Sequence, residues 1–257
     1  MADYVPGNHI VRTVWGRSET VLFIFAGASA EFALNKAVDW LYFTGRLPAD
    51  PLGRLFSTVQ YARRIVFSEQ RAAEKAIDSI TAIHKGVEAA RGASIPDWAY
   101  RDVLYLLIHY SVAAFELLER RMSVAEKEDL YSVFLGIGLR MGLKELPPTY
   151  AAWLPSRTSH LHADLARSRY TDDLYRQYRR QLGVFRYALL REVQVLLVPA
   201  HVRALLSLRP FSPLRLAVPL YKAGAAVGLD RWIKVLLLPK AYKAQIDALD
   251  VPRAPSV

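Results

Sequence analysis

The stretch over residues 96–120 constrains the fold more than any other part of the chain. A proline in a first-turn position and early aspartates at 97 and 102 favour the start of a helix, and an almost unbroken apolar body follows. Four polar side chains interrupt that body at spacings that a 3.6-residue turn places on one face: Asp102, Tyr105, His109 and Glu116. We therefore predict a central buried helix whose polar stripe is the candidate functional site.

The remaining chain also carries helical rather than strand periodicity. No long stretch alternates with period two, and no repeat of 20 to 50 residues is evident. Helices are predicted at about 21–41, 51–67, 69–90, 123–141, 149–167, 171–198, 200–208, 212–228 and 230–239. We expect an all-α fold, a single multi-helical bundle of roughly eight to eleven helices in one domain over residues 1–257, with basic C-terminal helices at 211–251.

Local signals place several helix starts. Asp50 with a following proline, Ser68, and Thr171 are predicted caps, and Ser123 with Glu126 forms a capping box. The predicted helix at 21–41 carries a polar line at spacing i, i+4, i+8, made of Glu31, Asn35 and Asp39. This line is either a solvent-facing edge or a row of hydrogen-bonding groups that faces a pocket.

Composition excludes several kinds of chemistry. The 257 residues include no cysteine, so disulfides, thiolate metal sites and cysteine nucleophiles are ruled out, and a reducing cytoplasm is compatible with the chain. The N-terminus lacks the features of a signal peptide, and no apolar run approaches the roughly 20 residues of a membrane span. We expect a cytoplasmic protein that is able to lie peripherally on a membrane.

The net charge of +10 is confined to the second half of the chain. Residues 1–149 carry 17 Lys and Arg against 17 Asp and Glu, whereas residues 150–257 carry 17 against 7. Cationic amphipathic helices suit an anionic membrane surface, and an ordinary solvated basic face explains the same excess. No nucleic-acid-binding motif is present, so nucleic acid ranks last among the partners.

Catalytic and metal-binding motifs are mostly missing. The chain has no dinucleotide fingerprint, P-loop, His-Glu-x-x-His or Gly-x-Ser-x-Gly. Residues three before His84 and His109 are not glutamates, which excludes a di-iron bundle. On a helix, His160 and His162 point about 200° apart and cannot share a metal ion, whereas in a strand or loop they could, so the pair is a weak metal signal. His84 borders an apolar face near a helix C-terminus, where the dipole favours a protonated imidazole; a capping or solvent-facing role is favoured there over the alternative of ligation.

One buried histidine on an apolar helix remains. His109 fits an axial haem ligand, because haem needs a neutral imidazole and a flat apolar slot. The alternative is a core histidine that is hydrogen-bonded to a neighbouring carboxylate.

A series of short motifs in a fixed order carries a family resemblance. They are Asp50-Pro51-Leu52-Gly53-Arg54-Leu55 with Thr58, His84-x-x-Val87, Leu107-Ile108-His109, Ser123-x-x-Glu126 and Leu146-Pro147-x-Thr149. Over roughly residues 15–210 the chain resembles the MpaB-type and latex-clearing (rubber) oxygenase family. The resemblance implies an all-α, globin-reminiscent core that holds haem b, with His109 as the proximal ligand and Arg54, Thr58 and His84 as pocket candidates.

The resemblance also implies an activity. Characterised members use oxygen to cleave carbon–carbon double bonds of apolar isoprenoid chains, so we expect a haem b-dependent oxygenase with a hydrophobic, lipid- or isoprenoid-like substrate. The chain departs from many relatives in its first long helix, where Phe25-Ala26-Gly27-Ala28 replaces an Ala-His-Pro type motif. The alternative is a cofactor-free helical protein, peripheral to the membrane, that binds a lipid or an isoprenoid.

Overall fold

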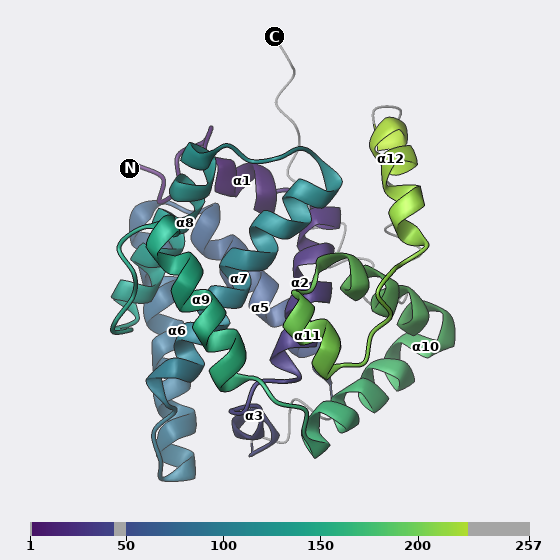
Figure 1. Cartoon of the computed structure of the whole chain (residues 1–257). Helices are drawn as coiled ribbons and strands as arrows, with labels where there is room; N and C mark the ends of the chain where they lie inside the picture. Colours follow the sequence, from purple (N-terminus) through teal and green to yellow (C-terminus); the bar gives the residue numbers. More distant parts are fainter. Residues whose placement is uncertain (1, 44–49, 226–257) are drawn as a thin grey trace.

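The computed structural model describes residues 2–43 and 50–225 (Figure 1). Its helices are α1 (Ile10–Trp15), α2 (Ser18–Phe32), α3 (Asp39–Phe43), α5 (Pro51–Val66), α6 (Gln70–Arg91), α7 (Asp97–Leu118), α8 (Val124–Arg140), α9 (Tyr150–Asp164), α10 (Arg169–Leu197), α11 (Ala200–Leu205) and α12 (Leu214–Ala225). In these two ranges, extended pairing is limited to isolated bridges between Asp3 and Glu69 and between Asn35 and Leu165. The predicted all-α class is confirmed.

Helix α7 is the centre of the bundle, as predicted for residues 96–120. Helices α1, α2, α8, α9, α10 and α12 all pack against it, with α2 forming the most extensive contact (Figure 1). The α2 and α7 backbones approach closely because Gly27 has no side chain: a Cβ atom there would lie 2.3 Å from Cδ1 of Tyr110. Because these helices surround α7, its apolar body is buried, and its polar side chains must find partners inside the bundle.

The predicted helix over 21–41 is wrong in its second half. Helix α2 ends at Phe32, and the chain turns before α3 begins at Asp39. In the turn, Leu34 O accepts from Ala166 N at 2.8 Å, Lys36 N donates to Asp164 O at 3.0 Å, and Asn35 Oδ1 accepts from Ala37 N at 2.9 Å. The first two bonds connect the turn to the far end of α9, which is distant in sequence, so helical periodicity alone could not reveal the break.

Local cap signals predict most other boundaries. Asp50 caps α5 by accepting from Gly53 N at 2.8 Å, and Ser123 with Glu126 forms the predicted capping box of α8. Two caps lie elsewhere than predicted. The N-cap of α6 is Glu69 rather than Ser68, and α10 starts with a capping box of Ser168 and Thr171, in which Thr171 is already the third helical residue.

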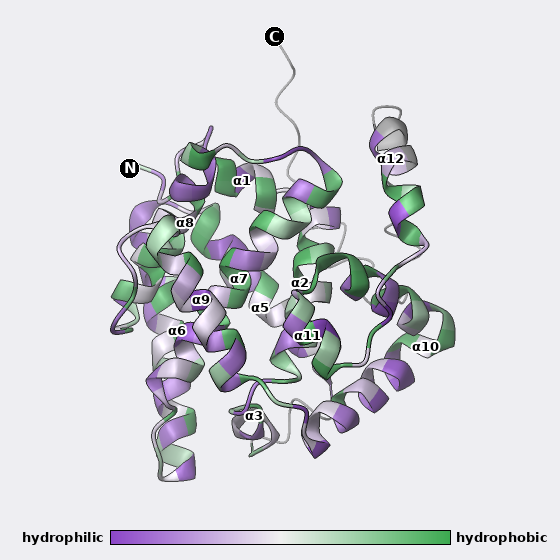
Figure 2. Ribbon diagram, viewed as in Figure 1, coloured by the Kyte–Doolittle hydropathy of each residue, from purple (hydrophilic) through white to green (hydrophobic). Residues whose placement is uncertain are grey.

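Helix α10 has the predicted length but changes direction at Gly183. This residue adopts φ 73° and ψ 170°, a conformation that a glycine tolerates and that interrupts the helical hydrogen bonds. The corner exposes Val184 and Phe185, whose exposed fractions are 69% and 64%. In Figure 2, much of α10 before the corner is coloured as hydrophilic, and the corner itself is coloured as hydrophobic.

Part of the predicted C-terminal region falls beyond the residues that the structure describes. This applies to the helix predicted at 230–239 and to most of the basic segment 211–251. Within residues 2–43 and 50–225, no helix has the length and hydrophobicity needed to cross a membrane.

Candidate functional site

His109 lies in the middle of α7 with one ring nitrogen sealed from water. Its Nε2 is buried and has no hydrogen-bond partner among the residues that the structure describes. The Tyr110 ring packs edge-on against the imidazole, with ring centroids 4.9 Å apart. Burial, with a smaller contribution from the Arg157 guanidinium, lowers the pKa of His109 to about 3. At neutral pH the imidazole is therefore uncharged, which is the form that binds a metal ion.

The other pocket candidates predicted from the sequence have different neighbours. His84 of α6 packs its ring against Tyr100 at 5.1 Å between centroids, and its Nδ1 is buried without a hydrogen-bond partner in the described part of the chain. Burial lowers the pKa of His84, with a further contribution from the Arg54 guanidinium of α5. Desolvation therefore outweighs the helix dipole in its effect on the pKa of His84. Thr58 donates its hydroxyl to the Arg54 carbonyl at 3.1 Å.

A buried ion pair beside His109 was not predicted as a site. Arg157 of α9 binds both carboxylate oxygens of Glu31 on α2, with Nη1 at 2.5 Å from Oε1, and the Tyr110 hydroxyl donates to Oε2 at 3.1 Å. Glu31 is 1% exposed and Arg157 is 4% exposed. The interpretation that Glu31 faces solvent is thus wrong. The alternative, a hydrogen-bonding role inside the protein, describes this residue.

The remaining groups of the polar stripe on α7 divide between two regions. Asp102 and Tyr105 face α9, where the Tyr105 hydroxyl lies 3.0 Å from the Ser156 hydroxyl. Glu116 lies two turns beyond His109, where it accepts from Met122 N at 3.1 Å and pairs with Lys127 at 2.8 Å. The residues of the stripe therefore share one face of the helix, but they contact different partners.

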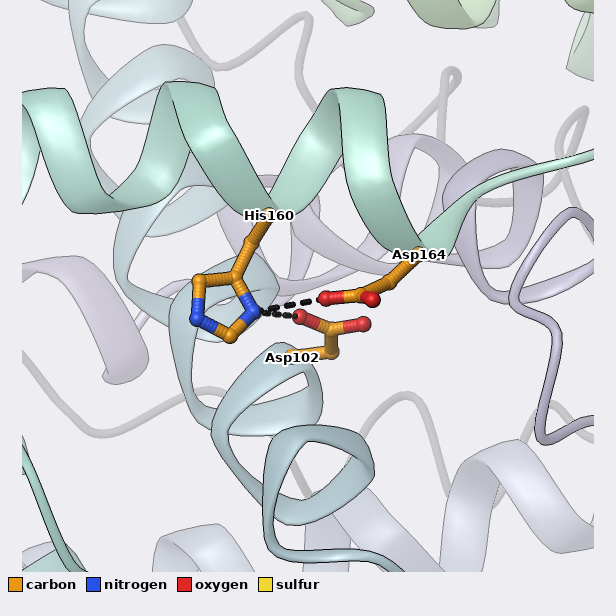
Figure 3. A group of neighbouring side chains, drawn as sticks. All are labelled: Asp102, His160 and Asp164. Carbon is orange, nitrogen blue, oxygen red and sulfur yellow. Dashed lines mark hydrogen bonds and ion pairs between the residues drawn. The ribbon is translucent and has the colours of Figure 1, made fainter.

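Asp102 belongs to a cluster that also contains His160 and Asp164 of α9 (Figure 3). Nδ1 of His160 lies 2.8 Å from Oδ1 of Asp102 and 2.8 Å from Oδ2 of Asp164. Asn35 donates Nδ2 to the other oxygen of Asp102 at 2.7 Å. The cluster was not predicted, because the sequence pattern His-x-His directs attention to His162 as the partner of His160. The signal that could have found it is the i, i+4 spacing of His160 and Asp164 on a helix.

His160 and His162 diverge, as predicted for a helix. The His162 ring instead packs against His201 of α11, with centroids 4.2 Å apart. The two side chains of the His-x-His sequence therefore have separate roles.

An open apolar pocket lies between α2, α5 and α10. Its cavity volume is about 80 Å³, and its lining consists of Leu22, Phe23, Phe25, Ala26, Ser29, Pro51, Leu52, Tyr178, Leu182, Arg186, Leu190 and Val193. Neither His109 nor Arg54, Thr58 or His84 is among these residues. Helix α2 lines the pocket with Ala26 and Ser29, whereas its Gly27 and Glu31 contact Tyr110 of α7. The pocket and the α2–α7 contact are therefore on different faces of α2.

Comparison with known proteins assigns the chain to a family. No curated protein and no solved structure matches it. The family model described as "ER-bound oxygenase mpaB/B'/Rubber oxygenase, catalytic domain" matches residues 13–233, which is most of the chain and includes every helix from α2 to α12. The chain therefore belongs to the family of ER-bound oxygenase mpaB/B' and rubber oxygenase catalytic domains.

Proposed function

We propose that this protein is a haem b-dependent oxygenase that acts on a hydrophobic, lipid- or isoprenoid-like substrate. The observation that carries the proposal is the buried, unpartnered Nε2 of His109 on the central helix. A buried nitrogen without a hydrogen bond is unfavourable unless it has another role, and coordination of an iron ion is such a role. Membership of an oxygenase family whose description names rubber supports both the reaction class and the apolar substrate.

The residues around His109 fit an axial ligand. Burial keeps the pKa near 3 and the imidazole neutral, and the tautomer with its proton on Nδ1 offers a lone pair on Nε2. Tyr110 restrains the ring through an edge-on contact, and its hydroxyl is fixed by Glu31. Arg157 is neutralised by Glu31, so the neighbourhood carries no net charge from this pair. When bound, haem would supply the iron that activates dioxygen, while these residues hold the ligand and exclude water.

The pocket between α2, α5 and α10 is the proposed place for an apolar chain. Its walls are mostly aliphatic and aromatic, with Ser29 and Arg186 among its few polar residues. Apolar walls of this kind favour a hydrocarbon over water by burying its surface.

The corner of α10 is the proposed point of contact with an anionic membrane. Val184 and Phe185 are exposed directly after Gly183, and arginines flank them at positions 176, 179, 180, 186 and 191. Apolar side chains that insert between acyl chains, surrounded by cations that bind lipid phosphates, are typical of peripheral membrane contact. Leu182 and Arg186 at the same corner also line the pocket, so a membrane-derived substrate would have a short path into it.

A second candidate function follows from one specific observation. His109 does not line the apolar pocket, and α2 lies between that pocket and Tyr110. A protein with this arrangement could bind a lipid or isoprenoid without a cofactor. It would then retain its ligand whether or not His109 is present.

The absorption spectrum of the purified protein tests the proposal. Expression with haem supplementation should give a Soret band, and His109→Ala should shift or abolish it, while substitution of an exposed histidine, His162→Ala, should leave it unchanged. A protein with no Soret band, or a His109→Ala spectrum identical to that of the wild type, would contradict the haem proposal.

Mass spectrometry of an organic extract distinguishes the two functions. An apolar ligand that co-purifies with a haem-free protein, and that is lost in the pocket-filling variant Ala26→Phe, would favour the cofactor-free binding protein. Loss of bound ligand in the same variant of a haem-containing protein would instead support the pocket as the substrate site of an oxygenase.

A further inference from the structure

We infer that Asp102, His160 and Asp164 form a binding site for a divalent transition-metal ion that links α7 to α9. The inference concerns a different group of residues from those around His109 and does not depend on the haem proposal. Figure 3 shows the three side chains pointing toward one another from the two helices. Their candidate ligand atoms all lie within 4.8 Å of one another.

The hydrogen bonding inside the cluster is incomplete without a further cation. A single Nδ1 carries at most one proton, yet it lies 2.8 Å from an oxygen of each carboxylate. One N–H group shared between both oxygens forms at best a three-centre hydrogen bond, in which the two contacts are not both well aligned. A metal ion accepts lone pairs from all three groups and removes this conflict.

The charge of the cluster is also unbalanced. Two carboxylates face one imidazole, so the cluster contains more acidic than basic groups. The side chains of Asp102, His160 and Asp164 are 3%, 15% and 16% exposed, so water screens this charge poorly. A divalent cation would compensate both carboxylates while the imidazole stays neutral.

The neighbouring cations are engaged elsewhere. Arg157 pairs with Glu31, and Arg101 pairs with Glu145 at 2.5 Å. Nζ of Lys36, in the turn after α2, donates to the carbonyl of Ala163 at 2.5 Å. None of these three side chains forms an ion pair with the cluster in the described structure, and Arg157 acts on Asp102 only through a longer-range electrostatic interaction.

Asn35 orients the Asp102 carboxylate, as residues that hydrogen-bond to metal ligands do in known metal sites. It donates to Oδ2 of Asp102 at 2.7 Å, which leaves Oδ1 directed at His160. Hydrogen bonds of this kind fix the geometry of metal-binding carboxylates. The turn that interrupts the predicted helix at 21–41 is what brings Asn35 to this position.

The donor set indicates which ions would bind. One imidazole nitrogen and two carboxylate oxygens suit Zn²⁺, Mn²⁺ or Fe²⁺, whereas Ca²⁺ and Mg²⁺ prefer oxygen ligands alone. Bonds of about 2.0–2.2 Å to zinc require donor atoms about 3.3–3.5 Å apart, wider than the 2.8 Å contacts here. Both carboxylates, those of Asp102 and Asp164, would therefore move apart slightly from the imidazole as the ion enters.

Zinc binding to the purified full-length protein tests the inference. After removal of metal with a chelator and dialysis, titration calorimetry with ZnCl₂ should show one site per chain that His160→Ala and Asp164→Asn abolish. Asn35→Ala, which removes only the orienting bond, should weaken binding about 10- to 100-fold. His162→Ala is the matched control, because it removes a histidine two positions away on the same helix and should leave this site intact.

Two results would overturn the inference. One is equilibrium dialysis followed by elemental analysis that finds no zinc retained by the wild-type protein, a measurement that needs no variant. The other is zinc binding that persists in folded Asp164→Asn and His160→Ala proteins or that is lost in His162→Ala, which would assign the ion to the His162–His201 pair. Circular dichroism of each variant verifies that it is folded.

Discussion

Glu31 and Arg157 are the most deeply buried charged pair described in the bundle. They come from α2 and α9, and each is almost completely removed from solvent. Transfer of such charges into the interior is unfavourable, and their mutual attraction with the Tyr110 hydrogen bond offsets it. Removal of one partner should therefore lower the free energy of unfolding more than removal of both.

Arg157→Met should lower the free energy of unfolding by about 3–5 kcal/mol, because it leaves the Glu31 carboxylate buried and unpaired. Urea denaturation measures the change. The double variant Glu31→Gln with Arg157→Met should recover a large part of the loss. Arg167→Met, which breaks a half-exposed pair with Asp172, is the control and should change stability by less than about 1 kcal/mol. Equal losses in Arg157→Met and in the double variant would show that Arg157 acts through packing alone.

Glu126 should make stability depend on pH in the acidic range. A hydrogen bond from Arg120, with a backbone bond from Ser123, lowers its pKa from the ordinary 4.5 to about 2. Because the folded state holds the carboxylate more strongly, its contribution is present above about pH 4.5 and is lost as pH falls toward 2. The stability difference between the wild type and Glu126→Gln, measured by thermal unfolding, should therefore shrink between pH 5 and pH 2. A difference that stays constant would contradict the effect.

At the scale of elements, the close contact between α2 and α7 organises the core. The contact depends on a small residue in α2 that faces an aromatic ring in α7. Interiors are packed densely, so an added methyl group has no space to enter without moving a neighbour.

Gly27→Ala should destabilise the protein, by about 1–3 kcal/mol, because the new Cβ would lie 2.3 Å from the ring of the fully buried Tyr110. Gly86→Ala is the matched control, since Gly86 lies inside α6 and a methyl group added there would have no other atom within 4 Å. It should stabilise by up to about 1 kcal/mol through helix propensity. Chemical denaturation of both variants gives the comparison, and equal effects would rule out the steric explanation.

At the scale of the whole molecule, charge and exposed apolar side chains meet at the corner of α10. The basic excess of residues 150–257 is in part carried by the arginines of this helix, and Gly183 places Val184 and Phe185 at the point where it turns. If this corner contacts a membrane, both its apolar and its cationic side chains contribute to binding.

Phe185→Asp should weaken binding to vesicles that contain anionic phosphatidylserine by about tenfold or more, because it removes an inserting side chain and adds a negative charge. Vesicle sedimentation at low and physiological salt measures the effect. Val124→Asp is the control, since Val124 is 84% exposed on α8, away from the corner. A wild-type protein that does not sediment with anionic vesicles would exclude the membrane role.

Sequence reasoning predicted the scaffold well and the site only in part. Helix periodicity and the caps at Asp50 and Ser123 are local, so the all-α class and the central helix around His109 followed from the sequence. The single domain over residues 1–257 and the ligand role of His109 stay predictions. Arg157 and Asp164 were missed, because a charged residue on a helix surface looks the same in sequence whether it meets solvent or a buried partner.

The sequence alone predicted the all-α class, most of the helix boundaries, the central helix around His109 and the family that the chain resembles. These properties depend on side chains a few positions apart, whose spacing is fixed by the helix itself. Only the tertiary structure decided that Glu31 meets Arg157 and that Asp102 meets His160 and Asp164. Glu31 and Arg157 are 126 positions apart and Asp102 and His160 are 58 apart, so their meeting depends on how α2, α7 and α9 pack.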